Sequence, residues 1–289
     1  MSDNLLVARG VQFDIRLHEP ATNTASVCGE LARAADESGA RLVVFPEAAL
    51  TGYVFESLEE ALSGAISADG PELAAVADAC RSANSWTVVG AIEREKDDVY
   101  NAAFLVGPDG VAGGYRKIHT LCLGVDRFAR RGDEFRVWDL PLGRIGINIC
   151  YDGTFPESSR SLKLLGAQLI ILPTNWPMLH MKLQQTQMRA YENHVNYFAV
   201  NRVGEERGTV FPGGSIAAGP RGELLAQGGN GEERIDVEFD MAASDRNRVV
   251  LVPGAYEFDY VADRRPDMYR PVTDHAQSGE PTGSMASEA

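Results

Sequence analysis

The sequence places a cysteine at the point where a buried strand should turn into a helix. Cys150 follows the apolar run IGINI over residues 145–149 and precedes YDGTFPE, in which Pro156 favours a helix start. A helix start leaves backbone N–H groups unpaired and carries partial positive charge, which favours a thiolate and an oxyanion beside it. The string therefore indicates a nucleophile, although a small apolar residue ending a strand would give the same local pattern.

Two further ionisable residues also follow strand-like segments. Glu47 comes directly after the apolar stretch 42–46, and Lys117 follows the returning strand of a hairpin. A cysteine nucleophile needs a base, an acid for the leaving amine, and a cation or N–H pair for the oxyanion. Glu47, Lys117 and Cys150 can supply these parts from three strand ends, although each alone could be an ordinary loop or packing residue.

The segments that position these residues alternate between strand-like and helix-like patterns. Apolar spacing predicts helices over residues 22–38, from Pro71 onward, and over 156–166 and 181–194. Strands are expected over residues 5–13, 42–45, 86–92, 102–106, 115–118, 135–140, 144–149, 169–172, 197–201, 215–218, 223–226 and 235–239. This alternation predicts an α/β fold in which helices cover the faces of a sheet.

Composition narrows the classes of function and location. A formal net charge of −14 argues against nucleic acid or an anionic membrane as partner, and it says little about a small-molecule substrate, whose site is local. The four cysteines have no CxxC spacing, so neither a disulfide framework nor a zinc site is expected. No signal peptide or membrane-spanning stretch is expected, and a cytoplasmic location is predicted. We expect one domain over residues 1–273 and a disordered tail over 274–289, where Ser, Gly, Glu and Pro dominate.

Three ordered signatures resemble those of the nitrilase (carbon–nitrogen hydrolase) superfamily. They are Phe45-Pro46-Glu47, Tyr115-Arg116-Lys117 and Ile149-Cys150-Tyr151-Asp152. The similarity covers roughly residues 5–270 and includes segments 172–177, 188–193, 201–204 and 213–223. It implies a four-layer αββα sandwich that commonly dimerises to αββααββα, so a homodimer or higher homo-oligomer is expected.

The resemblance also implies a mechanism. Glu47 would take the Cys150 proton, and the thiolate would attack the carbonyl or nitrile carbon. Lys117 and the backbone N–H of Tyr151 would hold the oxyanion, and water would then hydrolyse a thioester intermediate. This scheme requires neither a metal nor an organic cofactor.

The sequence departs from the family in one respect. Many members carry a second glutamate after the lysine, and here no glutamate follows Lys117 until Glu134. Asp126 is the nearest acidic candidate for that position, and the alternative is a loop aspartate paired with Arg127.

Three further side chains are expected to form pocket wall rather than to take part in catalysis. They are Tyr53, Asn175 and Trp176.

The most fitting activity is an amidase that converts a small primary amide to a carboxylate and ammonia. An N-carbamoyl (ureido) amidohydrolase and a nitrilase are the nearest alternatives, and Tyr151-Asp152 after the cysteine favours amides. An inactive scaffold or interaction protein with the same fold is an alternative of a different class, but it would have no need of all three reactive residues. A Cys–His protease, for which His119, His180 and His194 are the candidates, is disfavoured because a glutamate base suffices.

Overall fold

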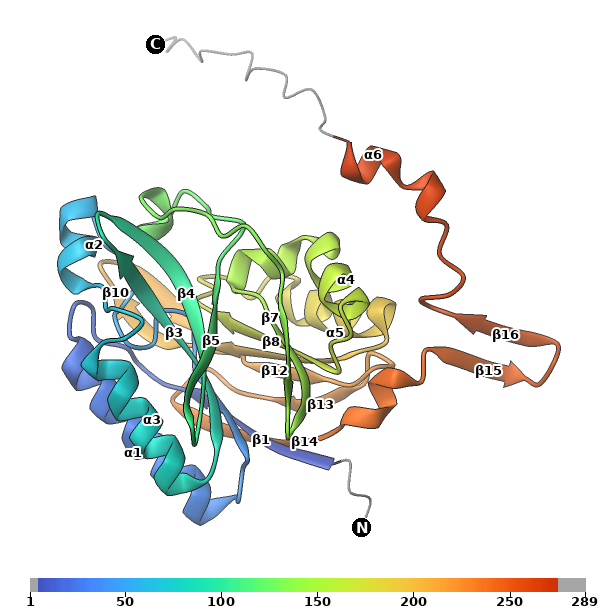
Figure 1. The fold of residues 1–289 in the computed structure, drawn as a ribbon, viewed down its shortest axis with the longest axis horizontal. Helices are drawn as coiled ribbons and strands as arrows, with labels where there is room; N and C mark the ends of the chain where they lie inside the picture. Colours follow the sequence, from blue (N-terminus) through green and yellow to red (C-terminus); the bar gives the residue numbers. More distant parts are fainter. Residues whose placement is uncertain (1–4, 275–289) are drawn as a thin grey trace, which may run out of the picture. The chain divides into compact units, whose positions relative to one another are not determined.

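The computed structural model describes residues 5–274, which divide into two compact units at the junction of Asn247 and Arg248 (Figure 1). The larger unit holds every residue expected in the site. No helix in the described part of the chain has the length and apolar character needed to cross a membrane. One domain over 1–273 stays a prediction, and the tail expected over 274–289 lies outside the described residues except for Asp274.

The first sheet of the larger unit has six strands and carries the Glu47 and Lys117 segments. In order across the sheet, the strands are β14 (Glu233–Asp240), β1 (Leu5–Gln12), β2 (Leu42–Val44), β3 (Trp86–Glu95), β4 (Asp98–Gly107) and β5 (Gly110–Arg116). Strands β1, β2 and β3 are parallel, and β14, β4 and β5 pair antiparallel with their neighbours.

The second sheet also has six strands and carries the Cys150 segment. In order, they are β13 (Leu224–Gln227), β12 (Ile216–Ala218), β9 (Asn196–Asn201), β8 (Leu169–Thr174), β7 (Gly143–Ile147) and β6 (Val137–Leu140). Again three neighbouring strands, β7, β8 and β9, are parallel. Each half of the unit therefore brings the carboxyl ends of parallel strands to one edge, where α/β sites commonly form.

Alternate side chains of β2 pack in two different hydrophobic cores, one on each face of the first sheet. Leu42 and Val44 belong to the core between the two sheets, together with Ile147 of β7. Val43 and Phe45 point to the opposite face and pack in the core beneath the helices. Because successive strand residues face opposite sides, both faces of this strand must be apolar. Fully burying each such side chain contributes about 1.5–3 kcal/mol.

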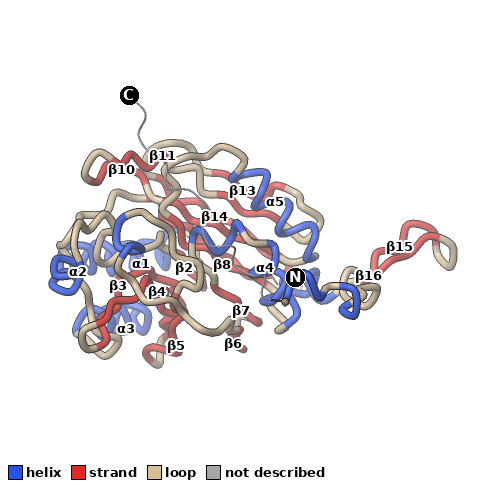
Figure 2. Tube along the Cα trace, turned by 90° about the horizontal axis from the view of Figure 1, so that it is seen from above, coloured by secondary structure: helices blue, strands red, loops and turns tan. Residues whose placement is uncertain are grey.

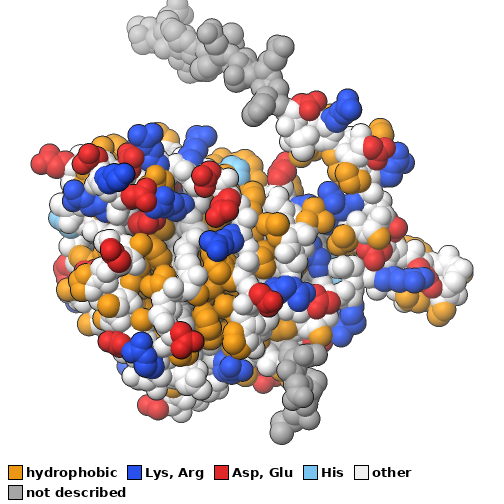
Figure 3. All heavy atoms as spheres, in the orientation of Figure 1, with side chains coloured by type: hydrophobic (Ala, Val, Ile, Leu, Met, Phe, Trp, Pro, Cys, Tyr) orange, Lys and Arg blue, Asp and Glu red, His pale blue; other side chains and the backbone are white. Residues whose placement is uncertain are grey.

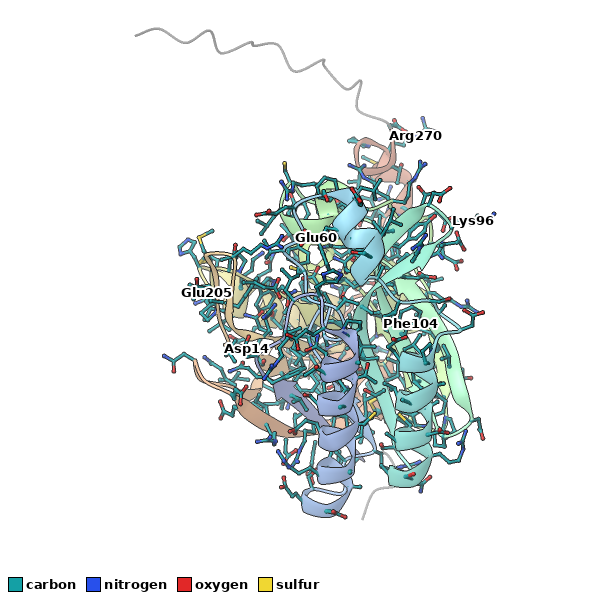
Figure 4. The ribbon with its side chains drawn as sticks, turned by 90° about the vertical axis from the view of Figure 1, so that its left-hand side faces the viewer. Asp14, Glu60, Lys96, Phe104, Glu205 and Arg270 are labelled. Atoms are coloured by element: carbon teal, nitrogen blue, oxygen red, sulfur yellow. The ribbon has the colours of Figure 1, made fainter. Side chains whose placement is uncertain are left out.

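Helices cover the outer faces of both sheets (Figure 2). Helices α1 (Pro20–Glu37) and α3 (Pro71–Ala83) lie side by side over the first sheet, in front of Phe104 of β4 (Figure 4). Helices α4 (Pro156–Leu164) and α5 (Lys182–Asn193) cover the second sheet. The order helix, sheet, sheet, helix confirms the expected four-layer sandwich.

Several elements of the structure were not expected from the sequence. Helix α2 (Leu58–Gly64) and the hairpin of β10 (Val203–Glu206) and β11 (Thr209–Pro212) belong to the larger unit. The smaller unit contains the hairpin of β15 (Arg248–Val252) and β16 (Tyr256–Asp259), followed by the short helix α6 (Arg270–Thr273).

Candidate active site

The Cys150 segment forms the strand, turn and helix that the sequence predicts. Strand β7 ends at Ile147, Cys150 opens a single 3₁₀ turn that runs to Thr154, and Pro156 begins α4. Cys150 has a φ of +45°, in the left-handed region that non-glycine residues rarely adopt. Such local strain is characteristic of functional sites, and here it holds the thiol at a sharp strand-to-helix turn.

Glu47 is fixed by close backbone packing at the end of β2. The Phe45 amide donates to the carbonyl of Val88 in β3, and Ala48 takes a φ of +53°. Gly90 of β3 passes so close that a Cβ there would lie 2.4 Å from the Ala48 nitrogen and 2.5 Å from the Pro46 carbonyl oxygen. The side chain of Glu47 is wholly buried.

Lys117 joins two carboxylates in the interior. Its Nζ donates to Glu47 Oε1 at 2.7 Å and to Asp126 Oδ2 at 2.6 Å, and all three side chains are inaccessible to solvent. Asn101 of β4 donates to Glu47 Oε1 at 2.7 Å and to Asp126 Oδ1 at 2.8 Å. A buried ion pair is retained only with such additional hydrogen bonds, because each charge has lost its hydration.

The charges in this cluster shift the pKa of each member. Burial raises the pKa of Glu47 above its ordinary 4.5, and the neighbouring Lys117 offsets only part of that rise. Burial alone would lower the pKa of Lys117, but Glu47 and Asp126 hold it well above its ordinary value. Lys117 therefore stays an ammonium, and Glu47 is a stronger base than a solvated glutamate.

The charges of Glu47 and Lys117 also act on Cys150. Burial, followed by the charge of Glu47, raises the pKa of the Cys150 thiol to about 12. Lys117, the Thr174 side chain and the Asn175 backbone act in the opposite direction. Cys150, Glu47 and Lys117 thus share one buried electrostatic environment, and the sulfur is a neutral thiol at rest.

Asp126 belongs to the buried cluster, so the alternative of a loop aspartate paired with Arg127 is wrong. Arg127 instead donates to the carbonyl oxygens of Gly124 and Phe55. The short carboxylate is accommodated because the 3₁₀ turn Gly124–Arg127 carries it inward, and Leu121 N donates to it at 3.2 Å. The resemblance had suggested Asp126 only by its proximity in the chain.

Asp152 is a buried residue to which sequence reasoning gave no role. Its Oδ2 accepts from the Tyr115 hydroxyl at 2.8 Å and from the Ile149 amide at 3.0 Å. Its Oδ1 accepts from the His119 amide at 2.9 Å and lies 2.7 Å from His119 Nδ1. Asp152 therefore ties the residues on both sides of Lys117 to the turn that carries Cys150.

The expected wall residues differ in their surroundings. The Tyr53 ring is buried with its centroid 5.8 Å from Lys117 Nζ. Tyr151, which was expected to act through its backbone N–H, is half-buried, and its ring packs edge-on against Phe155. Asn175 and Trp176 are buried directly after β8. Both Asn175 amide atoms and Trp176 Nε1 have no hydrogen-bond partner, and neither has Glu47 Oε2. Buried polar atoms without partners are rare, and a bound substrate or water could satisfy these.

The histidines do not form a protease-type pair with the cysteine. His119 interacts with Asp152 and stacks on Phe155 at 3.9 Å, and His180 is exposed. Cys122, which lies on the loop after Lys117, is exposed. Within residues 5–274, no group of three His, Cys, Asp or Glu side chains could hold a metal ion.

A separate cavity of about 380 Å³ opens on the outer face of the first sheet. Figure 3 shows hydrophobic side chains gathered in the middle of this view, with charged side chains around them. The cavity is lined in part by Phe104, Val111, Arg116 and Arg136, and none of the reactive residues lines it.

The αββα architecture and the buried acid–lysine cluster beside a cysteine are features of one class, the thiol-dependent carbon–nitrogen hydrolases. The carbon–nitrogen hydrolase family model matches residues 11–258, and the chain belongs to this family. A nitrilase of Pyrococcus abyssi is 38% identical over 262 residues, which cover 90% of this chain and 97% of that protein. An (R)-stereoselective amidase of Pseudomonas sp is 32% identical over 268 residues, which cover 92% of this chain and 93% of that protein.

A solved structure supports the assignment of the fold. A mutant of the Nesterenkonia AN1 amidase from the nitrilase superfamily superimposes with a TM-score of 0.79 at 24% identity. The match covers 92% of this chain and 97% of that chain. This match confirms the expected nitrilase-superfamily fold, and the family model and the curated relatives confirm the expected carbon–nitrogen hydrolase.

Proposed function

We propose that the protein is an amidase that hydrolyses a small primary amide to a carboxylate and ammonia through a thioester on Cys150. The observation that carries this proposal is the fully buried Glu47–Lys117–Asp126 cluster, whose charges act on the thiol. Removing one partner from such a cluster is strongly destabilising, and a cluster of this kind is costly to build for stability alone. A catalytic role accounts for that cost, whereas an inactive scaffold does not.

The first half-reaction forms the thioester. Because the Cys150 pKa is raised to about 12, the proton leaves the thiol only as the sulfur attacks the carbonyl carbon. Glu47 accepts this proton, and burial has made it a better acceptor by raising its pKa. The carbonyl π electrons move to oxygen, and the oxyanion is held by Lys117 Nζ and the Tyr151 N–H.

Lys117 has the capacity for this role. An ammonium group has three N–H donors, and two of those of Lys117 donate to Glu47 and Asp126. The third can donate to the oxyanion without breaking either ion pair. When the tetrahedral intermediate collapses, Glu47 returns its proton to the nitrogen, the C–N bond breaks and ammonia leaves.

The second half-reaction releases the acid. Water attacks the thioester carbon while Glu47 takes one of its protons. The C–S bond then breaks, the carboxylic acid leaves as its carboxylate, and Cys150 recovers a proton.

Nitrile hydrolysis is the second candidate, because the relative from Pyrococcus abyssi is named a nitrilase. The same thiol would add to a nitrile carbon to give a thioimidate, which water converts to the thioester with loss of ammonia. An N-carbamoyl substrate would react as the amides do, and it would release carbon dioxide as well as ammonia.

Ammonia release from a panel of acetamide, butyramide, N-carbamoyl-β-alanine and propionitrile tests the proposal. We expect release from at least one of the amides and none above background from Cys150→Ala. Cys122→Ala is the matched control, because Cys122 is exposed, and it should retain activity. Mass spectrometry of the quenched enzyme should find the acyl group on the peptide that contains Cys150.

The outcomes of this experiment separate the alternatives. Release from the nitrile or the ureido acid alone would favour the corresponding activity over the amidase. Equal background from the wild type and Cys150→Ala on every substrate, with no acyl adduct, would support the scaffold.

We also propose a homodimer or higher homo-oligomer in the cytoplasm. Exposed apolar side chains on α4 and α5, including Leu164 and Met188, support a covered helix face. Light scattering on the purified chain tests the oligomer. The four free cysteines are consistent with a reducing compartment, and fractionation of cells tests the location.

A further inference from the structure

Lys182 lies between the two segments that surround Cys150. It is the first residue of α5, and its Nζ donates to Thr154 Oγ1 at 3.1 Å and to Gln185 Oε1 at 3.2 Å. Thr154 ends the turn that Cys150 begins. The same Nζ lies 5.9 Å from the centroid of the Trp176 ring, which follows the Thr174–Asn175 segment beside the thiol.

This ammonium has no carboxylate partner in the part of the chain that the structure describes. Its two hydrogen-bond acceptors, Thr154 and Gln185, are neutral. The chain carries 41 Asp and Glu residues against 27 Lys and Arg, and the buried cations Arg9 and Arg202 each contact two carboxylates. Partial burial of a cation without a counter-ion costs free energy, and a bound anion would reduce that cost. The absence of a carboxylate partner is unusual in so acidic a chain.

The electrostatics place Lys182 in the same environment as the nucleophile. Burial lowers the pKa of Lys182, and negative charge on Cys150 opposes that effect. The two side chains are therefore close enough to interact electrostatically.

Residues 175 and 176, whose second member has its ring near this cation, carry neutral hydrogen-bond donors without partners. Trp176 is 3% exposed and its indole N–H has no partner, and the Asn175 amide nitrogen, 2% exposed, has none. An indole N–H can only donate, so an oxygen atom must be its partner when the site is filled. Arg189, the other cation whose charge acts on Lys182, is paired with Glu192 at 2.8 Å. One unpaired cation with neutral donors therefore suits a singly charged group with two oxygens.

We propose that Lys182 binds a carboxylate on the acyl group of the substrate, so that the preferred substrates are monoamides of short dicarboxylic acids. This rests on the proposed amidase function and adds the substrate class. The carboxylate would supply the counter-ion that Lys182 lacks. A dianionic phosphate suits the site less well, because one ammonium leaves half its charge uncompensated.

Two pairs of amides of matched length provide the test. Succinamate and butyramide differ by a carboxylate in place of a methyl group, and glutaramate and valeramide differ in the same way. Ammonia release by the full chain gives kcat/KM for each. The wild type should prefer the acidic member of at least one pair by about 10-fold or more, as expected for a hydrogen bond to a charged group.

Lys182→Gln should lower kcat/KM for the acidic amide by about 10- to 100-fold, mainly through KM, with a much smaller loss for the neutral amide. Lys182→Arg keeps the charge and should recover part of the preference. Lys96→Gln, in the exposed turn between β3 and β4 (Figure 4), is the matched control and should change neither member of a pair. Succinate should also inhibit the wild type more strongly than it inhibits Lys182→Gln.

The results distinguish this inference from the proposed function. Equal rates on both members of each pair, or an equal loss on both in Lys182→Gln, would overturn the carboxylate site and leave the amidase intact. Hydrolysis of no amide, with no adduct on Cys150, would overturn the amidase itself. If Lys182→Gln fails to fold, the pair preference of the wild type and its inhibition by succinate against butyrate still decide the question.

Discussion

At Lys117 a single ammonium is shared by two carboxylates and ordered from both sides. Its amide donates to the Asn101 carbonyl at 2.8 Å, and its own carbonyl accepts from Gly132 at 2.9 Å. Because the backbone is fixed, the direction of the side chain depends on Glu47 and Asp126. We expect Asp126 to be a positioning residue that acts through Lys117.

Asp126→Asn tests this role. The variant leaves Lys117 with one carboxylate in a dry site, so we expect the free energy of unfolding to fall by about 3 kcal/mol. A misplaced ammonium should lower kcat by about 10²-fold, the usual cost of losing one oxyanion donor. Denaturant unfolding and steady-state kinetics measure the two effects. The exposed Asp133→Asn is the control, and wild-type kcat in Asp126→Asn would contradict the assignment.

The pH dependence of the reaction should report Glu47. Glu47 accepts a proton only when it is ionised, and burial raises its pKa above 4.5. As pH falls through this raised value, kcat/KM should therefore decline, at a higher pH than an ordinary glutamate would give. Lys117 has a pKa well above 10.5 and should not contribute an alkaline limb near neutrality. A profile from pH 4 to 9, with circular dichroism to exclude unfolding, checks this, and an acid limb below 4.5 would contradict it.

The sequence identified single reactive residues better than it identified their partners. Glu47, Lys117 and Cys150 each follow a strand, which a local pattern can detect. Asp152 receives bonds from Tyr115 and His119, residues more than thirty positions earlier, and no local pattern connects them. Asn101 lies in β4, one residue before the segment 102–106 that was predicted as a strand, and no local pattern marks it.

Among the elements, β3 sets how closely the Glu47 segment can approach. Gly90 faces the backbone at Ala48 and Pro46, where any side chain would collide with main-chain atoms. Backbone cannot move aside as a flexible side chain can, so the absence of a Cβ is a requirement here.

Gly90→Ala should displace Glu47 and abolish most activity. Overpacking of this kind typically costs about 1–3 kcal/mol of stability. Gly29→Ala is the matched control, because Gly29 lies in α1 with no atom within 4 Å of an added Cβ. That exposed helical position should gain about 0.5–1 kcal/mol. Thermal unfolding and amide hydrolysis distinguish them, and an active Gly90→Ala would refute the packing argument.

Helices were predicted correctly where the helical spacing of apolar residues continued over several turns. Helices α1, α3, α4 and α5 have apolar residues at helical spacing and begin close to the predicted positions. Helix α2 spans only Leu58–Gly64, and β10 with β11 has mixed burial, so neither gives a clear period.

At the scale of the whole molecule, Arg202 joins distant parts of the larger unit. Its guanidinium contacts Glu206 and Asp14 and donates to the carbonyl of Ile15, although its side chain is wholly buried. Glu206 in turn accepts from the amide of Tyr53 at 3.0 Å. Figure 4 shows Asp14 and the β10–β11 hairpin, at Glu205, on the same side of the molecule.

Arg202→Met should destabilise the larger unit strongly. It leaves Glu206 buried without its cation, and breaking a buried pair costs about 3–5 kcal/mol. Arg81→Met is the control, because the Arg81–Asp78 pair is exposed and should contribute less than about 1 kcal/mol. Urea unfolding of both variants measures the difference, and equal stabilities would show that Arg202 contributes nothing beyond packing.

The division of the strands into two sheets could not be derived from their order. Parallel strands with crossover helices give the same alternation whether they form one sheet or two. Only the family resemblance specified two sheets. The close contact of Gly10 in β1 with Phe198 in β9, where a Cβ would lie 2.7 Å from the ring, depends on that packing.

The left-handed backbone at Cys150 lowers the stability of the folded state, although the proposed catalysis requires a cysteine at this position. An L-residue in this region costs roughly 1–2 kcal/mol relative to one in the right-handed region, and glycine escapes most of that cost. We therefore expect Cys150→Gly to unfold at a higher temperature than Cys150→Ala, the reverse of their order in a helix. Selection for thermostability alone would drive this position toward glycine. A cysteine is therefore retained at position 150 only under selection for catalytic activity.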